Sequence, residues 1–348
     1  MLVLDGSYGE GGGQILRTAL SLAALQGQEV RIERIRARRP KPGLRPQHLT
    51  AVRALASITQ AEVRGAQIGS CDLTFKPRGI YPGNYTFDVA EGTASAGSVT
   101  LIAQALLPPL ALAAAPSVLT LKGGTHVPWS PPAHYLSLVF FPALQKLGLT
   151  ARLELLTWGW YPRGGGEIRL TIQPVKSLKP VTWTEAPDSQ AFRGLSAAAN
   201  LPEHVINRQR QRLIARLGWP LPVDRVQAPS RGPGSLVFLW GPQVGFSALG
   251  ARGKRAESVA DEVADAFFHF QSQQAAVDGR LADQIILYLV LANGRSVIHT
   301  EEITSHLLTN IFVIEQFRGP KFKIAGKLGE PGLISTEAGP DQEAETSA

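Results

Sequence analysis

The residues best suited to chemistry lie between Asp5 and His48. A glycine-rich turn, Gly9–Gln14, leads directly into the apolar helical run Ile15–Leu22. A cationic stretch, Arg34–His48, follows. A helix that starts from a glycine-rich turn offers free backbone N–H groups to an anion, and nearby guanidinium groups strengthen that preference. The two segments together predict a phosphate site, and therefore chemistry on RNA or nucleotides.

The glycine turn matches neither of the common nucleotide-binding loops. No lysine followed by serine or threonine closes it, as a Walker A loop requires, and its glycine spacing differs from the dinucleotide fingerprint. Arg17, in the first turn of the helix, is placed to fork onto phosphate oxygens. Glu10 would repel a phosphate unless a divalent cation lay between them, so Glu10 is a candidate metal ligand. The alternative is an ordinary turn carboxylate.

The cationic stretch carries most of the net charge. Seven basic residues and one acid lie between Arg31 and Arg45, which gives this stretch +6 of the formal +7 of the chain. Pro40, Pro42 and Pro46 are expected to hold the backbone extended, so that the side chains form a rigid row of cations. Such a row would bind the phosphates of any nucleic acid without reading its sequence. The alternative is a solvated charged face.

His306 is the candidate nucleophile. The chain has no G-x-S-x-G serine motif, and Val3 stands at the lysine position of a ligase-type K-x-D-G motif. A histidine that attacks phosphorus is therefore a reasonable covalent option. The alternative is a structural histidine at the start of an apolar helix. If His306 is the nucleophile, we expect four neighbouring hydroxyl and amide side chains to orient its ring, those of Thr304, Ser305, Thr309 and Asn310.

The bulk composition indicates a globular protein of two domains. The chain has 348 residues, of which 44% are hydrophobic and 18% charged, which is enough for a full core. The single cysteine, Cys71, excludes an intrachain disulfide and is expected to be a buried small side chain. The start of the chain lacks a signal-peptide pattern, and the apolar stretch 101–115 is too short and too proline-rich to span a bilayer. We therefore expect a cytosolic protein without a membrane segment.

Helical and strand patterns alternate along the chain. Helices are predicted over 14–25, 47–59, 95–107, 135–147 and 282–291, the third being stopped by Pro108 and Pro109. Alternating runs at 30–35, 73–75 and 168–172 predict half-exposed strands. Mixed elements of this kind indicate an α/β (α+β) fold. Similar helix starts at 11–16, 96–101 and 281–286 indicate a repeated unit.

The character of the sequence changes between about residues 184 and 272. This segment combines a polar basic helix (203–216), a Pro/Gly-rich loop (228–234) and a second helix (257–270). It reads as a domain inserted into the first one. The predicted organisation is a large domain over 1–183 and 276–338, a small inserted domain over 184–275, and a disordered tail over 339–348.

Taken together, the motifs resemble those of the RNA 3′-terminal phosphate cyclases. The resemblance runs in order through most of the chain. It rests on GEGGGQILRT at 9–18, IRARRPKPGLRPQH at 35–48, SAGSVTLIAQALLP at 95–108, Gly123–Thr125, YPRGGG at 161–166, Ala282–Gln284 and HLLTNIFVIEQF at 306–317. The family fold implied is a large domain of three repeated helix-on-four-stranded-sheet units, with a smaller α/β domain inserted before the last repeat.

The resemblance also implies roles for single residues. His306 falls on the nucleophile of the family, which takes AMP from ATP to form a covalent histidine–AMP. Glu10 and Gln104 match positions that contact the metal and the nucleotide. Positions needed for activity or for holding phosphate are matched by Arg17, Arg36, Arg39 and Gln47. The nucleotide-contacting segment is matched by Arg280, Leu281, Ala282, Asp283 and Gln284.

The implied reaction needs ATP, a divalent metal (Mg²⁺ or Mn²⁺) and an RNA with a 3′-terminal phosphate. After transfer of AMP from His306 to that phosphate, the adjacent 2′-hydroxyl closes a 2′,3′-cyclic phosphate, a step that benefits from proximity. The alternatives are an RNA-binding relative without catalysis, and an enolpyruvate-transferase-like enzyme acting on small phosphorylated substrates. The presence of His306, Glu10 and Arg17 argues against an RNA-binding relative without catalysis. The cationic stretch and the His306 segment argue against an enolpyruvate-transferase-like enzyme. Oligomeric state stays open.

The chain departs from the family pattern in two places. Arg280 stands where relatives can place an aromatic ring that stacks on adenine, although an arginine plane can also stack. Ala251 and Arg255 occupy positions that are often Glu and Pro. Neither departure touches the predicted nucleophile.

Overall fold

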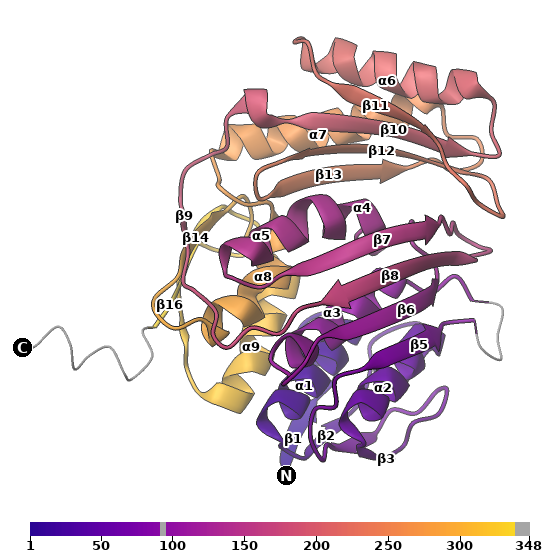
Figure 1. Ribbon diagram of the computed structural model, residues 1–348. Coiled ribbons are helices and arrows are strands. Elements are labelled where there is room, and N and C mark those ends of the chain that lie inside the picture. Colours follow the sequence, from indigo (N-terminus) through magenta and orange to yellow (C-terminus); the bar gives the residue numbers. More distant parts are fainter. Residues whose placement is uncertain (91–94, 338–348) are drawn as a thin grey trace, which may run out of the picture.

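Figure 1 shows the computed structural model, which describes residues 1–90 and 95–337. These residues form four sheets of four strands each. In three of the sheets the first two strands of a unit run parallel, and the second strand pairs antiparallel with a hairpin that closes the unit. Parallel neighbours need a crossover connection, and here it is a helix. The predicted repeat of helix-on-sheet units is therefore confirmed.

The first two units follow each other directly along the chain. The first consists of β1 (Leu2–Asp5), α1 (Gly13–Gln26), β2 (Val30–Glu33), α2 (Pro46–Thr59), β3 (Glu62–Arg64) and β4 (Leu73–Lys76). The second consists of β5 (Asn84–Asp88), α3 (Val99–Ala111), β6 (Ser117–Gly123), a broken helix, β7 (Ala151–Thr157) and β8 (Gly166–Ile172). The broken helix comprises α4 (Ala133–Tyr135), the π-helical η1 (Leu136–Phe140) and α5 (Phe141–Lys146).

The third unit is interrupted by the fourth sheet. It begins with β9 (Thr182–Trp183) and resumes with α8 (Gly279–Leu291), β14 (Val297–Thr300), α9 (Ser305–Arg318), β15 (Phe322–Ala325) and β16 (Gly332–Thr336). Between them lie the 3₁₀ turn η2 (Ser189–Ala191), β10 (Arg193–Ala199), α6 (Glu203–Leu217), β11 (Val223–Gln227), β12 (Gly234–Gly241), β13 (Val244–Leu249) and α7 (Ala256–Gln273). The exact domain boundaries at 183/184 and 275/276 stay a prediction.

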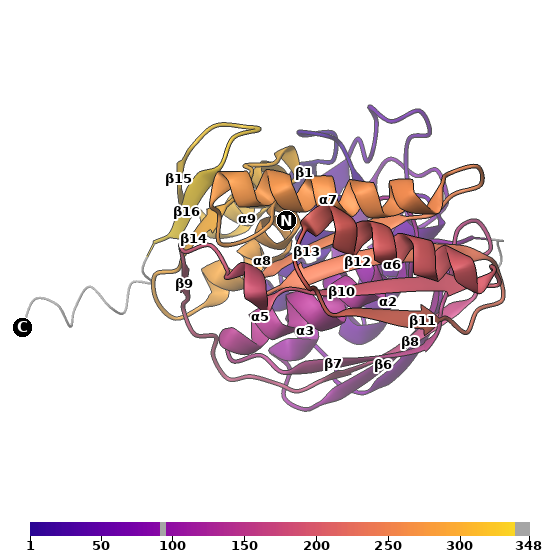
Figure 2. The ribbon, with the colours of Figure 1, turned by 90° about the horizontal axis from the view of Figure 1, so that it is seen from above.

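The fourth sheet has its own apolar core. Phe192, Val237, Phe246 and Phe267 belong to a buried cluster separate from the large one that joins the three repeated units. In Figure 2, seen from above, α6 and α7 both cover the outer face of this sheet. Ion pairs such as Arg208–Glu257 (2.7 Å) and Arg212–Asp261 (2.7 Å) join the two helices. These basic residues of α6 therefore serve to pack one helix against the other.

A buried carboxylate connects this sheet to the third unit. Asp278 caps α8 by accepting from the Leu281 N–H (2.8 Å), and it also accepts from the Tyr135 hydroxyl (2.8 Å) and from the Gly245 N–H of β13 (2.8 Å). Burial raises the pKa of Asp278, while these donors oppose the shift. The start of α8, which carries Arg280, is thereby fixed in position.

The prediction that Pro108 and Pro109 end the third helix was wrong. The helix α3 begins at Val99, after Ser98 as N-cap, and runs through both prolines to Ala111. Proline in a helix leaves the carbonyl four residues earlier without its usual donor. The freed carbonyl of Ala105 instead accepts from the Ser21 hydroxyl of α1 at 2.7 Å. A hydroxyl of the neighbouring helix α1 thus replaces the hydrogen bond that Pro109 removes, which the sequence pattern could not reveal.

Other predictions need smaller corrections. The predicted strand 30–35 ends at Glu33, and the helix expected from residue 282 already starts at Gly279. Cys71 is exposed rather than buried, because it lies in the turn before β4 and not in a core. The tail 339–348, predicted to be disordered, lies outside the described residues. No helix in the described ranges is both long enough and apolar enough to cross a membrane.

Candidate active site

His306 lies in the first turn of α9, and half of its side chain is exposed (50%). Thr304 caps this helix by accepting from the Leu307 N–H at 3.0 Å. The Nδ1 atom of His306 lies 3.2 Å from Oε1 of Glu10. A carboxylate at this distance favours a proton on Nδ1, which leaves the lone pair of Nε2 free. Nε2 is therefore the ring nitrogen that is available to react or to bind a ligand.

Glu10 is held on several sides. Its Oε2 lies 3.4 Å from Nη2 of Arg39, and its Oε1 accepts from the Ser305 hydroxyl. Ser305 was predicted to orient the imidazole together with three neighbours, but it acts on Glu10 instead. Thr304 caps the helix, Thr309 donates to the Ser305 carbonyl and Asn310 bonds to Asp283, so these three do not orient the ring by hydrogen bonds either.

The glycine turn fits against α9 and α2 because Gly9 and Gly13 have no side chains. Gly9 has φ +56°, a conformation that favours glycine, and a Cβ there would collide with the Thr309 hydroxyl. A Cβ at Gly13 would overlap the ring of His48, which is buried (6% exposed). The glycines therefore bring Glu10 and the N-terminus of α1 against α9 and His306.

Several arginines surround the buried ring of His48. Burial, and then the charges of Arg17, Arg36 and Arg45, lower the pKa of His48 to about 3, so this histidine is neutral. Burial also lowers the pKa of Arg17 to about 10, with Asp283 opposing the shift, so Arg17 keeps its charge at neutral pH. Burial and the nearby charges of Arg45 and Arg39 lower the pKa of Arg36 as well. A concentration of like charge of this kind is suited to phosphate.

The prediction that the cationic stretch forms an extended row was wrong. The segment after β2 folds into successive turns, with positive φ at Arg34 (52°) and Arg36 (53°) and at Gly43 (73°). Arg36 donates to the carbonyls of Lys41 (2.7 Å) and Gly43 (2.9 Å), which fixes the turns. These side-chain-to-backbone bonds override the extended preference of the prolines. The result is a folded loop that brings Arg36 and Arg39 towards the glycine turn.

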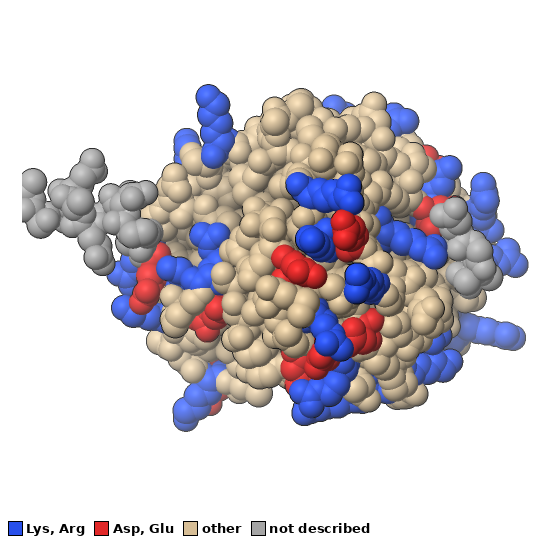
Figure 3. All heavy atoms as spheres, turned by 90° about the horizontal axis from the view of Figure 1, so that it is seen from below, with Lys and Arg blue, Asp and Glu red and all other residues tan. Residues whose placement is uncertain are grey.

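Part of this positive charge is also neutralised locally. Arg34 pairs with Asp5 (2.6 Å), and Arg31 pairs with Asp72 (2.8 Å) and Glu33 (3.3 Å). Figure 3 views the molecule from below, on the side of the first sheet, and shows lysine and arginine side chains interspersed with aspartate and glutamate. The charge of the sequence segment is therefore not one continuous patch.

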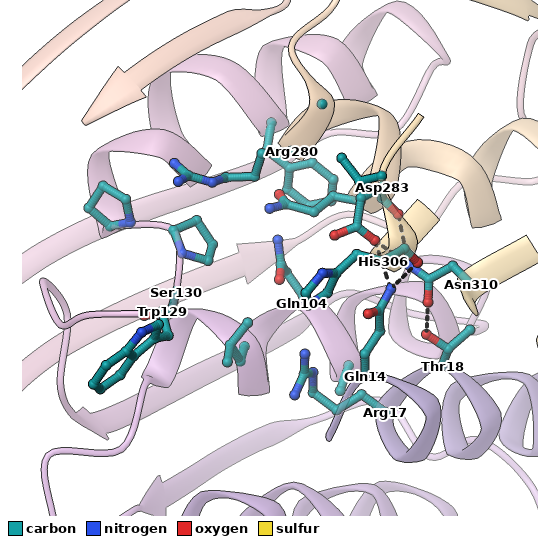
Figure 4. A pocket seen from close by; sticks show the side chains of 18 of the residues that line it. Gln14, Arg17, Thr18, Gln104, Trp129, Ser130, Arg280, Asp283, His306 and Asn310 are labelled. Carbon is teal, nitrogen blue, oxygen red and sulfur yellow. Dashed lines mark hydrogen bonds between the residues drawn. The ribbon is translucent and has the colours of Figure 1, made fainter. Parts of the chain in front are cut away.

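A pocket of about 640 Å³ opens beside His306. Figure 4 shows its lining, with Arg17 and Gln14 from α1, Gln104 from α3, Arg280 and Asp283 from α8, and Trp129 at one side. The pocket thus lies where the three repeated units meet, and the small sheet contributes Ser247 to Leu249 to its wall. A cleft between units with a few polar groups is the usual form of a small-molecule site.

A hydrogen-bond network fixes the wall next to His306. The amide Nδ of Asn310 donates to the Asp283 carbonyl (2.9 Å), and its oxygen accepts from Thr18 (2.7 Å). Gln14 donates to Oδ1 of Asp283 (2.9 Å) and to the backbone carbonyl of His306 (2.6 Å). Burial raises the pKa of Asp283, while His306 and Arg17 oppose the shift. The network fixes α1, α8 and α9 relative to one another.

Three polar atoms of the pocket lining have no hydrogen-bond partner among the described residues. They are Nε2 of Gln104, Oε1 of Gln284 and the hydroxyl of Tyr288, and all three are buried. Buried polar groups are nearly always paired, so unpaired ones in a cleft indicate a ligand that supplies the partner. Together they offer both a donor and an acceptor, as a nucleotide with its mixed polar edges requires.

The predicted site residues fall into two groups. Arg17, Gln104, Arg280, Asp283, Gln284 and His306 all line the pocket, whereas Glu10 lies against His306 and Arg39 against Glu10. Leu281 and Ala282 are fully buried and do not line it. Arg36 fixes its own loop, and Gln47 accepts from the Ser98 N–H (3.2 Å) at the start of α3. Arg280 lies over the Tyr135 ring, 5.2 Å from its centroid.

The sequence reasoning missed Gln14, Trp129 and Tyr288. Gln14 was seen only as the end of the glycine motif, and Tyr288 lies one turn beyond Gln284 on the same face of α8, a spacing that could have found it. Trp129 carries no periodic signal, because it lies in a loop.

For a metal ion, the described residues offer no group of three or more His, Cys, Asp or Glu side chains. Two carboxylates lie near His306: that of Glu10, 3.2 Å from Nδ1, and that of Asp283, whose raised pKa the charge of His306 opposes. Mg²⁺ commonly binds through one or two carboxylates together with substrate phosphates and water. The residues present therefore fit a metal that arrives with a nucleotide, and not a metal held by the protein alone.

Comparison with known proteins gives the family. Residues 8–324 match the family model described as RNA 3′-terminal phosphate cyclase. Relatives named RNA 3′-terminal phosphate cyclase include one from Thermococcus onnurineus, 44% identical over 342 residues (96% of this chain, 98% of the relative). Another, from Gloeothece citriformis, is 46% identical over 327 residues (91% and 93%), and one from Methylococcus capsulatus is 46% identical over 328 residues (91% and 91%).

A solved structure, the enolpyruvyl transferase NikO from Streptomyces tendae, aligns with 93% of this chain and 46% of its own. Its sequence identity is 12% and its TM-score 0.37, too low to compare the two sites. The family match, by contrast, extends over the glycine turn, the pocket lining and His306. The chain belongs to the RNA 3′-terminal phosphate cyclase family.

Proposed function

We propose that the protein uses ATP to convert an RNA 3′-terminal phosphate into a 2′,3′-cyclic phosphate, through a covalent adduct of AMP on His306. The observation that carries the proposal is the half-exposed His306, with Nδ1 against Glu10, beside a pocket whose buried polar atoms lack partners. ATP fits the pocket by its chemistry, since it brings a base with donors and acceptors and a polyanionic chain towards Arg17. The family membership supports the RNA substrate.

In the first step, Nε2 of His306 attacks the α-phosphorus of ATP, and the bond to the bridging oxygen breaks to release pyrophosphate. Glu10 holds the Nδ1 proton and stabilises the positive charge that develops on the ring. Arg17 and Arg39 lie on the side of the glycine turn, where their charge offsets that of the phosphates. A divalent metal ion held by Glu10 and the nucleotide would add further charge neutralisation.

In the second step, an oxygen of the RNA 3′-phosphate attacks the phosphorus of the adduct, and the P–N bond to His306 breaks. In the third, the oxygen of the adjacent 2′-hydroxyl attacks the 3′-phosphorus, its proton passes to water, and AMP leaves, which closes the cyclic phosphate. The attacking hydroxyl and the phosphorus belong to the same nucleotide, so proximity lowers the barrier without a strong base. The roles of the protein in both steps are to hold the phosphates and to keep the terminus in place.

The test is labelling with α-³²P-ATP and Mg²⁺ or Mn²⁺ in the absence of RNA. Wild type, His306→Ala and the control His204→Ala, an exposed histidine of α6, are compared on a denaturing gel. We expect an acid-labile, alkali-stable label on wild type and on the control, and none on His306→Ala. Label on His306→Ala, or no label on wild type with either metal, would show that the proposed adduct is wrong.

A further inference from the structure

Trp129 is an exposed aromatic residue beside the active-site pocket. Its side chain is 95% exposed, and its backbone has φ 60°, an unfavourable conformation for a bulky residue. Trp129 lies between Pro128 and Ser130 in the loop from β6 to α4, and all three line the pocket. In Figure 4 the indole lies at the side of the pocket, away from the Asp283 network. A residue held at an unfavourable φ that presents its indole to solvent points to a ligand outside the protein.

The neighbouring loop, residues 158–165, contains the YPRGGG motif, for which the active site gives no role. The two loops share one base. The N–H groups of Thr125 and His126 both donate to the Gly159 carbonyl at 3.0 Å. Beneath the loops, His126 stacks on Trp158, with ring centroids 4.2 Å apart and both side chains buried. This buried stack fixes the positions at which the loops leave the second sheet.

The 158–165 loop adds an aromatic residue and positive charge on the base that it shares with the Trp129 loop. Tyr161 is 65% exposed, and Arg163 is exposed as well. Arg231, from the loop before β12 of the small sheet, packs its stem over Gly165, while the Arg163 stem packs over Gly232. Within the described ranges neither arginine forms an ion pair, in contrast to Arg31 and Arg34 near the first sheet.

We propose that Trp129, Tyr161, Arg163 and Arg231 form a track that binds the single-stranded RNA leading to the 3′-terminal phosphate, with Trp129 at the end next to the pocket. The indole and phenol rings stack on bases, and the guanidinium groups contact backbone phosphates. Stacking on exposed aromatics combined with positive charge is how proteins hold single strands without reading sequence. The inference rests on the proposed function, and it deepens that function by naming how the RNA is held.

The charge pattern favours RNA over a protein partner. Among residues 1–90 and 95–337, neither Arg163 nor Arg231 forms an ion pair with an acidic residue, so both charges are available to phosphates. The centre of a protein interface would instead need an apolar cluster, whereas Trp129 and Tyr161 are single exposed rings on two separate loops. A strand that crosses the track enters the pocket beside Trp129, where its 3′-phosphate can reach the nucleophile.

The first test measures binding, which does not require catalysis. Fluorescence anisotropy gives the Kd of a 3′-phosphorylated ten-nucleotide RNA and of a 3′-phosphorylated dinucleotide for wild type, Trp129→Ala and the double variant Arg163→Glu/Arg231→Glu. Arg64→Glu, on an exposed position of β3, serves as the charge control. We expect a Kd for the long RNA at least tenfold higher in Trp129→Ala and in the double variant, with the control unchanged. The double variant should change the dinucleotide Kd less than threefold.

Salt dependence provides a second readout. Each phosphate contact on a single strand contributes about 0.7 to the slope of log K against log salt, so replacing both arginines by glutamine should make the slope shallower by about 1.4. The proposed track would be overturned if the Kd for the long RNA were unchanged in both Trp129→Ala and Arg163→Glu/Arg231→Glu. It would also be overturned if these variants lost affinity equally for the long RNA and the dinucleotide. Failure of labelling at His306 would overturn the proposed adduct alone, because RNA binding is measured without ATP.

Discussion

Two adjacent glycines at the start of α1 are expected to respond in opposite ways to the same substitution. Gly12 is the N-cap, with φ −86° and ψ −179°, and a Cβ there would lie 3.5 Å from Nη2 of Arg39, an ordinary contact. A Cβ at Gly13 would overlap the ring of His48 and lie 3.3 Å from Nη1 of Arg17. Gly12→Ser and Gly13→Ser therefore form a matched pair in which only one variant disturbs the site.

The expected magnitudes follow from these contacts. Serine is as good an N-cap as any residue, so Gly12→Ser should change the free energy of unfolding by only a few tenths of a kcal/mol, in the stabilising direction. At Gly13, overpacking costs about 1–3 kcal/mol. The gain from replacing a helical glycine offsets about 0.5 kcal/mol of that cost. For a chain of this length the remaining loss corresponds to a Tm lower by about 1–4 °C.

The same overlap should slow the chemistry. A ring of His48 that moves to make room displaces Arg17, and misplacing such a group by about 1 Å can reduce a rate by about a hundredfold. We expect self-adenylylation of Gly13→Ser to fall at least tenfold, measured as the initial rate of labelling with α-³²P-ATP. Equal Tm values and equal labelling rates for the two serine variants would refute the argument that Gly13 is required for close packing.

A double-mutant cycle checks the cause. His48→Ala removes the ring that the serine would strike, so it should cost less in the Gly13→Ser background than in wild type. Additive losses in Tm would show that the serine acts elsewhere.

Three further predictions concern Glu10, the buried His134 and Cys71. Glu10→Ala removes the partner of His306 Nδ1. A hydrogen bond to a charged group contributes about 1.5–3 kcal/mol, so labelling should slow about 10- to 100-fold. Labelling at the wild-type rate would contradict the role of Glu10. Burial lowers the pKa of His134 to about 4, below the value of about 6.5 expected in the unfolded chain. The stability that the neutral ring contributes is therefore complete above pH 6.5 and is lost as the pH falls from 6.5 towards 4. Tm should drop between pH 7 and pH 5, and the drop should be smaller in His134→Gln. An equal drop in both proteins would count against this assignment. Cys71 is the only cysteine and is exposed, so one thiol per folded chain should react with Ellman's reagent at the rate of a small-molecule thiol, whereas slow reaction would indicate that it is covered.

Local patterns in the sequence predicted most helices within a few residues. Apolar periodicity located α1 and α2, because a helix that packs on a sheet must repeat its apolar side chains at helical spacing. The same reasoning failed at Pro108 and Pro109, where a hydroxyl from another helix supplied the missing hydrogen bond. It failed again after β2, where Arg36 bonds to backbone carbonyls and curls a segment that proline content suggested was extended.

The sequence by itself determined the family and the repeated units, and it singled out His306 as the candidate nucleophile, since each depends on a short run of residues or on motifs in order. Only the tertiary structure decided how the site is assembled. Glu10 contacts Ser305, and Gln14 contacts His306, across almost the whole length of the chain. The packing of α1 against α9 makes these contacts, and no local pattern encodes the relative position of two helices. Likewise, the unpaired polar atoms of Gln104 and Gln284 indicate a ligand only because α3 and α8 enclose a common cavity. A polar atom lacks a hydrogen-bond partner only when it is buried, and its burial depends on every element packed around it.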